Sequence, residues 1–402
     1  MLGLEMATFG IDDGYVEAIC RSLRKGFLRE ETYLQLKASS SMQEFRLVLE
    51  DTDYAPYIAN EGNPIEIVAL KNRCKEKLMT EIQHMIGQST QPLTGFLERM
   101  LHGYQIESVV GMIEGIKNEQ SIEVIKKGID PLGDFAELKN IRIVEGNDYA
   151  TLYQQVLIDL PIGDYFRKFL DNCLSNVDHL KDGKKKDAAF ISETMKDFKA
   201  EKIKNMLKKI WLAEFHKYCM DNLQGDSSRS IMDDLLKFES DCMTIQIIYN
   251  STDIRGLSDA RGREVERRNY INSLGYLYPD KDQELNQADT FDKLKAAVRG
   301  YEYEHMLAQI SDSDKEGGFS SQGKSIDDVM FVEKARRYSM AFENGFHYGV
   351  FYAYLKLREM EIKNLVWLAE LVSIGVPRQM PGWSKYVLPF KYHKNEAGQG
   401  QQ

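Results

Sequence analysis

The sequence contains only nine prolines and five cysteines in 402 residues, and it lacks any long uninterrupted apolar run. Scarce proline, together with frequent Leu, Lys, Glu and Met, favours an all-α protein, because proline breaks helix interiors. The cysteines are odd in number and never form a C-x-x-C pair, which is typical of a reducing compartment. No run approaches the ~18 apolar residues of a membrane-spanning helix, and no basic-then-apolar leader opens the sequence. We therefore expect no membrane span and no secretory signal.

The chain is acidic, with a formal net charge of −10 and a pI near 5.4. Surfaces that bind nucleic acid usually carry a basic excess, so this balance disfavours nucleic acid as the main partner. The one basic run, Lys184–Lys186, lies in a polar segment, 178–197, which interrupts the surrounding pattern. We interpret it as a solvated loop, and the alternative is a contact with anionic lipid headgroups or an acidic partner.

The stretch 326–375 has the strongest helical pattern in the chain. It contains no proline, and the glycine-bounded interval 345–349 indicates either two helices that meet at a bend or one long helix with a weak point. The second half is apolar on two neighbouring stripes, so we expect other elements to cover most of its circumference. Arg358, Glu361 and Asn364 lie within these stripes and must therefore find buried partners.

A short helix followed by an aromatic turn recurs three times, beginning at Ser41, Asp148 and Thr290, which are all good helix N-caps. The tyrosines that follow are Tyr54, Tyr165, and Tyr301 or Tyr303. Two longer helical segments come after each turn, namely 67–87 with 94–117, 201–223 with 231–250, and the stretch 326–375. The pattern predicts three pseudo-symmetric helical domains. Their bounds are 1–130, 131–256 with the insertion 178–197, and 257–390, before a disordered tail at 391–402.

An overlay of the second long segments places Glu107, Asp241 and Glu361 at the same position within an apolar helix. Two interpretations remain open. The three acids could be buried and paired with Arg or Tyr, which would fix the helix register. Alternatively, they could line a shared concavity at the centre of three similar domains.

Residues 318–325, GFSSQGKS, satisfy the phosphate-loop pattern G-x-x-x-x-G-K-[ST]. A phosphate loop follows a buried strand, but residues 311–317 are polar and acidic, and no later strand ends in an Asp for magnesium. We interpret the segment as a flexible loop in which Ser325 caps the next helix, with Asp328 as its third-position acid. The seven histidines pair with no cysteine or histidine at ligand spacing. The residues therefore indicate no catalytic, cofactor or metal site.

Several blocks resemble the family that comprises d subunits of vacuolar-type proton ATPases (V-ATPases) and C subunits of bacterial and archaeal V/A-type ATPases. They are FGIDDGYVEAICRSLRKG (9–26), LEDTDYAPYIANE (49–61), DPLGDF (130–135), LGYLYP (274–279) and ENGFHYGVFYAYLKLREMEIKNLVWLAE (343–370). The resemblance extends from residue 9 to about residue 390. It is interrupted at 178–197 and ends before the tail.

The resemblance implies a funnel-shaped all-α body and a non-catalytic rotor-coupling subunit without a cofactor. Such a subunit lies on the cytosolic face of an acidic-organelle membrane, between the proteolipid c-ring and central-stalk subunits D and F, so that ATP hydrolysis drives proton transport. Its contact with the membrane is indirect, through the ring. The candidate interface or structural residues are Glu107, Asp241, Arg358, Glu361 and Asn364. The alternative function is a helical-repeat scaffold or adaptor unrelated to a rotary ATPase.

Overall fold

The computed structural model describes residues 2–139, 160–175, 200–252, 267–310 and 324–378, together with Met380 and Trp383. These residues form 17 α-helices and one short 3-10 helix, and they include no β-strand. The all-α class predicted from the sequence is therefore confirmed. Across the same described ranges, no helix combines the length and apolarity needed to cross a bilayer.

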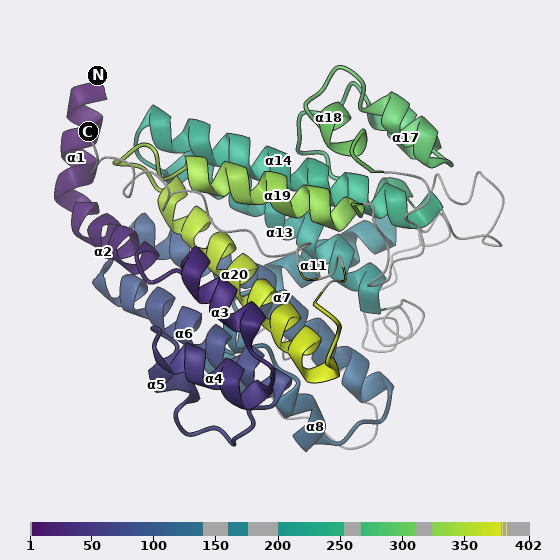
Figure 1. Ribbon diagram of the computed structural model, residues 1–402. Helices are drawn as coiled ribbons and strands as arrows, with labels where there is room; N and C mark the ends of the chain where they lie inside the picture. Colours follow the sequence, from purple (N-terminus) through teal and green to yellow (C-terminus); the bar gives the residue numbers. More distant parts are fainter. Residues whose placement is uncertain are drawn as a thin grey trace, which may run out of the picture.

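The helices follow one another along the chain as short helices leading into long ones (Figure 1). The first group is α1 (Leu2–Asp12), α2 (Gly14–Arg24), α3 (Glu30–Ala38), α4 (Met42–Glu50), α5 (Ala55–Ile58), α6 (Ile67–Gln88), α7 (Leu93–Lys117), α8 (Ile122–Lys127), η1 (Pro131–Gly133) and α9 (Ala136–Lys139). The second is α11 (Gly163–Ser175), α13 (Ala200–Asn222) and α14 (Asp226–Thr252). The third is α16 (Asp282–Gln287), α17 (Phe291–Ala297), α18 (Tyr303–Leu307), α19 (Ile326–Met340) and α20 (Gly349–Ile374).

Three helix starts predicted from capping residues are confirmed. The side chains of Ser41 and Thr290 each accept a hydrogen bond from the backbone N–H three residues later, as N-caps do. Ser325 and Asp328 form a reciprocal capping box at the start of α19. Residues 311–323 of the glycine-rich loop, Asp148, the Lys-rich segment 178–197 and the tail 391–402 lie outside the described residues.

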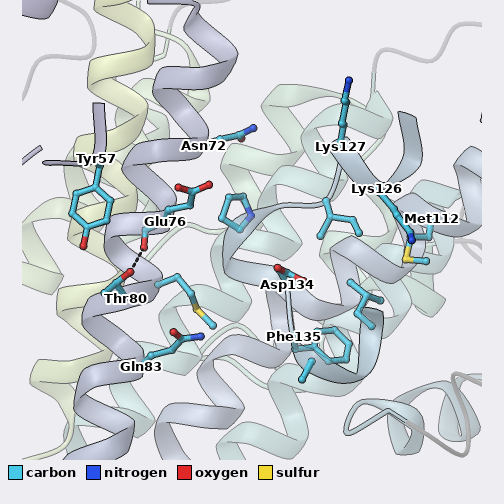
Figure 2. A pocket seen from close by; sticks show the side chains of 15 residues that line it. Tyr57, Asn72, Glu76, Thr80, Gln83, Met112, Lys126, Lys127, Asp134 and Phe135 are labelled. Carbon is cyan, nitrogen blue, oxygen red and sulfur yellow. Dashed lines mark hydrogen bonds between the residues drawn. The ribbon is translucent and has the colours of Figure 1, made fainter. Parts of the chain in front are cut away.

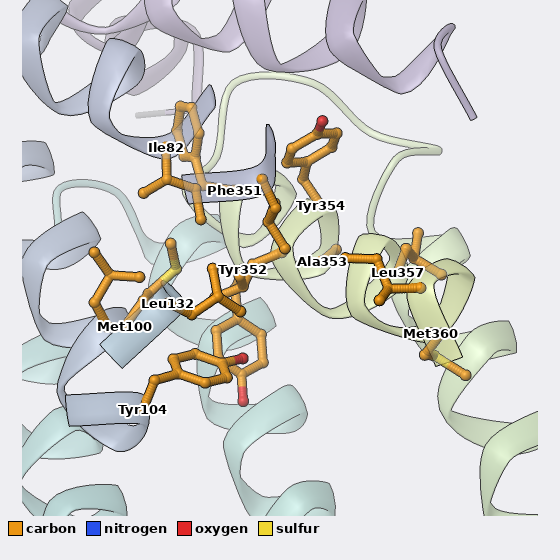
Figure 3. Packing of buried hydrophobic residues seen from close by; sticks show 14 of the residues in the cluster. Ile82, Met100, Tyr104, Leu132, Phe351, Tyr352, Ala353, Tyr354, Leu357 and Met360 are labelled. Carbon is orange, nitrogen blue, oxygen red and sulfur yellow. The ribbon is translucent and has the colours of Figure 1, made fainter. Parts of the chain in front are cut away.

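Helix α20 occupies the middle of the molecule and is separate from α19, so the stretch 326–375 forms two helices. It contacts α2 and α6 from the start of the chain as well as α14 and α19 (Figure 1). Figure 3 shows Phe351 beside Ile82 of α6, and Tyr352 beside Tyr104 of α7. Most of its side chains are buried, which confirms the expectation drawn from its two apolar stripes. The last long helix therefore completes a core begun by the first helices.

Buried apolar side chains form two cores. The larger core draws on the first helices, α13, the start of α14 and α20. The smaller core runs from Phe238 to Met330 and combines the rest of α14 with α16, α17, α18 and the start of α19. The predicted domain bounds at 130 and 256 stay a prediction, because residues 253–266 lie outside the described part of the chain.

In each aromatic turn, the hydroxyl of one tyrosine forms a hydrogen bond with a side chain on a long helix of a different predicted repeat. The pairs are Tyr54 with Glu361 on α20 (2.7 Å), Tyr165 with His102 on α7 (2.8 Å), and Tyr303 with Asp241 on α14 (2.8 Å). The first turn thus contacts the third repeat, the second contacts the first, and the third contacts the second. This cyclic docking links the three predicted repeats through buried polar contacts.

Candidate functional site

Glu361, in the middle of α20, is fully buried, and its carboxylate has hydrogen-bond and ion-pair partners. Its carboxylate accepts hydrogen bonds from the backbone N–H of Leu28 (2.7 Å) and from the hydroxyl of Tyr54 (2.7 Å). It also pairs with Arg358, one turn earlier, at 2.6 Å. A buried charge is tolerated when it is paired and hydrogen-bonded in this way. Glu361 therefore holds the loop before α3 and the turn before α5 against α20.

Arg358 extends the same cluster to the end of α2. Its guanidinium donates to the carbonyls of Leu23 and Gly26, both at 3.1 Å, and lies over the ring of Phe27, 4.1 Å from the centroid. Carbonyls at a helix C-terminus lack partners within the helix, so a buried cation there can donate hydrogen bonds to them. Arg358 thus connects the end of α2 to Glu361.

Asp241 on α14 is held in a similar way to Glu361, by a nearby loop and a tyrosine. We call each of these two sites, around Glu361 and around Asp241, a socket. Its carboxylate accepts from the backbone N–H groups of Tyr276 (2.8 Å) and Leu277 (3.4 Å) and from the hydroxyl of Tyr303. Burial raises the pKa of Asp241 to about 6 despite these three donors. The loop comes this close because Gly275 has no side chain, and a Cβ there would overlap the Asp241 carboxylate.

The two sockets are built from residues at the same spacing along the chain. Leu28, Ser41 and Tyr54 supply the backbone donor, the helix cap and the hydroxyl of the first, and Leu277, Thr290 and Tyr303 supply those of the second. The carboxylate in each case comes from a long helix elsewhere in the chain. This likeness supports the repeat hypothesis.

Asn364 is also fully buried on α20, and neither atom of its amide has a hydrogen-bond partner among the described residues. It lies within the packed helix layers and lines none of the larger cavities. Asp241, Arg358, Glu361 and Asn364 therefore share an interior, structural setting.

Glu107 on α7 differs from the other two recurring acids, because it faces a cavity of about 540 Å³. This central cavity is bounded by α7, α13, α14, α19 and α20, so its walls come from all three predicted repeats. Glu107 forms an ion pair with Lys208 of α13. Burial opposes its ionisation, but Lys208 and the nearby Lys204 outweigh burial and lower the pKa of Glu107.

The central cavity is lined by lysines, acidic side chains and aromatic side chains. Its lysines are Lys75, Lys204, Lys208, Lys334, Lys356 and Lys363, and its acids are Glu107, Asp130, Glu201, Glu239 and Glu359. Four ion pairs form between them: Lys75 with Asp130, Lys208 with Glu107, Lys334 with Glu239 (3.3 Å), and Lys356 with Glu359 (3.6 Å). In the part of the chain that the structure describes, Lys204 and Lys363 form no ion pair.

Glu239 of α14 is the most strongly held acid of the central cavity. Lys334 pairs with it, and Tyr338 donates its hydroxyl to the same carboxylate. Burial disfavours the charged form, but Lys334 and Lys356 outweigh it and lower the pKa of Glu239 to about 2. The carboxylate thus stays ionised at any physiological pH and joins α14 to α19.

This pKa gives a pH-dependent contribution to stability. Because the folded-state pKa is depressed, the stabilisation is present above the unfolded pKa, ~4.3, and is lost as pH falls toward 2. We expect Glu239→Gln to lower the free energy of unfolding by about 3 kcal/mol at pH 7 and by progressively less between pH 4.5 and 2.5. Urea unfolding across this range measures the difference. Exposed Glu98 is the matched control, and Glu98→Gln should show no such trend; a pH-independent loss in Glu239→Gln would contradict the assignment.

The sequence pattern singled out Glu107 as a candidate site residue but none of the lysines that line the cavity around it. A signal was present, because Tyr352, Lys356, Glu359 and Lys363 form a third stripe at helical spacing on α20. This polar stripe lies beside the two apolar stripes that predicted burial. A polar stripe on a helix otherwise covered by protein indicates a face open to solvent or to a cavity.

A larger cavity, of about 1010 Å³, lies between α6 and the segment from α7 to α9 (Figure 2). Figure 2 shows Glu76, Thr80 and Gln83 of α6 on one side and Asp134 and Phe135 on the other. Its lining residues lie between Tyr57 and Leu138, so they come from the first predicted repeat and the start of the second. Its lining residues form no comparable set of ion pairs in the described part of the chain, so the central cavity, with its four ion pairs, is the stronger functional candidate.

Within the described ranges, no group of three or more His, Cys, Asp or Glu side chains is placed to hold a metal ion. Lys324, the lysine of the phosphate-loop pattern, donates to the side-chain oxygen of Gln309 at 3.1 Å.

In its described residues, the protein is all-helical and contains a cavity lined by charged side chains from several long helices. A profile of the family described as ATP synthase (C/AC39) subunit matches residues 16–382, and the chain belongs to this family. A protein of Oryza sativa subsp. japonica, named probable V-type proton ATPase subunit d, is 31% identical over 93% of this chain and 96% of its own length. The V-type proton ATPase subunit d of Dictyostelium discoideum is 32% identical over 93% of this chain and 94% of its own. The protein of the same name from Saccharomyces cerevisiae is 25% identical over 92% of this chain and 96% of its own.

The match confirms the family predicted from the sequence blocks. Near-complete coverage of both chains indicates that this chain and the d subunits share their whole architecture. The family therefore places the chain among the subunits of a membrane-associated, multisubunit ATPase complex.

Proposed function

We propose that this chain is the rotor-coupling subunit of a V-type proton-pumping ATPase. In this role it receives central-stalk subunits D and F in the central cavity and rests on the proteolipid c-ring. ATP hydrolysis elsewhere in the complex turns the stalk, and the chain passes the torque to the ring that moves protons. It is not an enzyme, and it contacts the membrane only through the ring, on the cytosolic face of an acidic organelle.

The observation that carries this proposal is a cavity whose walls come from all three predicted repeats. A shaft seated there would touch α7, α13, α14, α19 and α20 together, so a sideways force would be shared by the whole body. A contact spread over several polar and aromatic groups resists slipping better than a single small contact. The names of the relatives, V-type proton ATPase subunit d, support the same role.

Torque transfer also requires a body that does not deform. The cyclic docking of Tyr54, Tyr165 and Tyr303 onto helices of other repeats supplies links between the predicted domains. Close-packed helices have low compressibility, and buried charge pairs add directional links to that packing. The buried sockets of Asp241 and Glu361 therefore serve stiffness, while the central cavity serves binding.

Deletion of the chain in the cells that carry it should abolish ATP-driven acidification of membrane vesicles. ATP hydrolysis by the detached catalytic sector should continue, because the proposed subunit performs no chemistry. Acidification measured by a pH-sensitive dye, alongside phosphate release, tests this, with re-expression of the intact chain as the control. Normal acidification in the deletion would overturn the proposal.

The alternative of a scaffold unrelated to a rotary ATPase is disfavoured by the family match over residues 16–382. A pull-down from gently solubilised membranes separates the two. The coupling role requires that proteolipid and stalk subunits co-purify with the chain, whereas an unrelated scaffold would bring down neither.

A further inference from the structure

We propose that the central cavity receives an acidic protein segment whose carboxylates pair with Lys204 and Lys363. The inference rests on the proposed coupling function and deepens it, since it states the chemistry of the stalk end that enters the cavity. It rests on the charge and the composition of the cavity walls.

The cavity has more lysines than it can neutralise. Of its five acids, Glu107, Asp130, Glu239 and Glu359 are already paired with a lysine each. The fifth, Glu201, lies in the first turn of α13, where the helix dipole already stabilises a negative charge. Lys204 and Lys363 consequently remain as cations without an ion-pair partner in the described residues.

Lys363 also lies in a setting that favours an incoming anion. Lys363 is exposed to solvent at the cavity, but the surrounding protein still lowers its pKa, an effect that Glu359 opposes and that the like charges of Lys334 and Lys356 increase. A carboxylate placed beside Lys363 would stabilise its charged form, because an opposite charge within about 4–6 Å has that effect. The excess is local, since the whole chain carries a net charge of −10.

The remaining wall residues match a protein segment better than a small polyphosphate. Tyr104, Trp211, Phe331 and Tyr352 lie among the lysines, and aromatic side chains are enriched at protein interfaces. No arginine lines the cavity within the described residues. Bidentate phosphate recognition favours the guanidinium fork, whereas lysine acts as a point charge toward carboxylates and phosphates alike, so it is the aromatic residues that favour a protein segment.

The test is a double charge reversal, Lys204→Glu with Lys363→Glu, in the full-length chain. Binding to the purified complex of central-stalk subunits D and F from the same source is measured at 50, 150 and 500 mM NaCl. We expect at least about tenfold weaker binding at low salt and a flatter salt dependence, because two attractive pairs become repulsive. The matched control is Lys71→Glu with Lys217→Glu, which changes two exposed lysines outside this cavity and should bind within about twofold of the native chain.

The outcomes separate this inference from the proposed function. If the native chain fails to bind the stalk complex at all, the coupling function fails. If the native chain binds and the double reversal binds equally well with the same salt dependence, the acidic-segment inference is wrong while coupling stands. Recovery of binding by a lysine placed at an acidic position of the stalk tip would confirm the pairing. Binding of tripolyphosphate that the double reversal abolishes, with stalk binding unchanged, would overturn it in favour of a small anion.

Discussion

Arg358→Ala is expected to lower the free energy of unfolding by about 3–5 kcal/mol, since it leaves the carboxylate of Glu361 buried and unpaired. Glu361 is fully buried and cannot rotate into water. The same change removes the donors to the carbonyls of Leu23 and Gly26 and the packing on Phe27. Urea unfolding followed by far-ultraviolet circular dichroism measures the loss.

Arg336→Ala is the matched control, because Arg336 lies half-exposed on α19 and pairs with Glu333 at the surface. Exposed pairs contribute only about 0–1 kcal/mol. A double variant, Arg358→Met with Glu361→Leu, should lose less than the sum of the two single losses, as the two charges are removed together. Equal losses in Arg358→Ala and Arg336→Ala would show that the buried cluster does not hold α2 to α20.

Gly275→Ala should cost about 3 kcal/mol or more, for two independent reasons. The backbone at Gly275 has φ +138°, a region that residues with a side chain rarely adopt. An added Cβ would also overlap the Asp241 carboxylate and would push the loop off α14. The hydroxyl of Tyr303 and the backbone N–H of Tyr276 would lose their acceptor. Thermal unfolding measures the effect.

Gly111→Ala supplies the comparison, because Gly111 lies in the interior of α7 and a Cβ there meets nothing within 4 Å. This change should stabilise the protein by about 0.5–1 kcal/mol, as alanine forms helix better than glycine. In an Asp241→Ala background, the steric part of the Gly275→Ala cost should shrink. A Gly275→Ala variant as stable as the native chain would show that the loop can move without loss.

The long helices were predictable because their apolar periodicity and caps are local properties. The segments 67–87, 94–117 and 201–223 correspond to α6, α7 and α13 within a residue or two, and Ser41 and Thr290 begin helices as predicted. For 231–250 the sequence missed one turn, since α14 already begins at Asp226. Residues 226–230 are polar, so apolar periodicity could not detect that turn.

The surroundings of the three recurring acids, Glu107, Asp241 and Glu361, were not predictable from their position in the helix alone. Glu361 and Asp241 follow the interpretation of buried, paired acids, whereas Glu107 faces the central cavity. The same helical position therefore serves two purposes. The difference comes from partners distant in sequence, since Leu28 and Tyr54 reach Glu361 only after the chain has folded back. Whether any of the five candidate residues contacts a partner protein stays a hypothesis.

The position of α20 has a consequence for biosynthesis. Gly26, Leu28 and Tyr54 precede Arg358 and Glu361, which they contact, by more than 300 residues, so these contacts cannot form until α20 has been synthesised. The nascent N-terminal helices therefore cannot close their core one domain at a time, as many multidomain chains do. A chain that stops before α20 lacks one wall of the central cavity. The cavity is therefore complete only in a chain that has been synthesised through α20 and has folded back on its first helices.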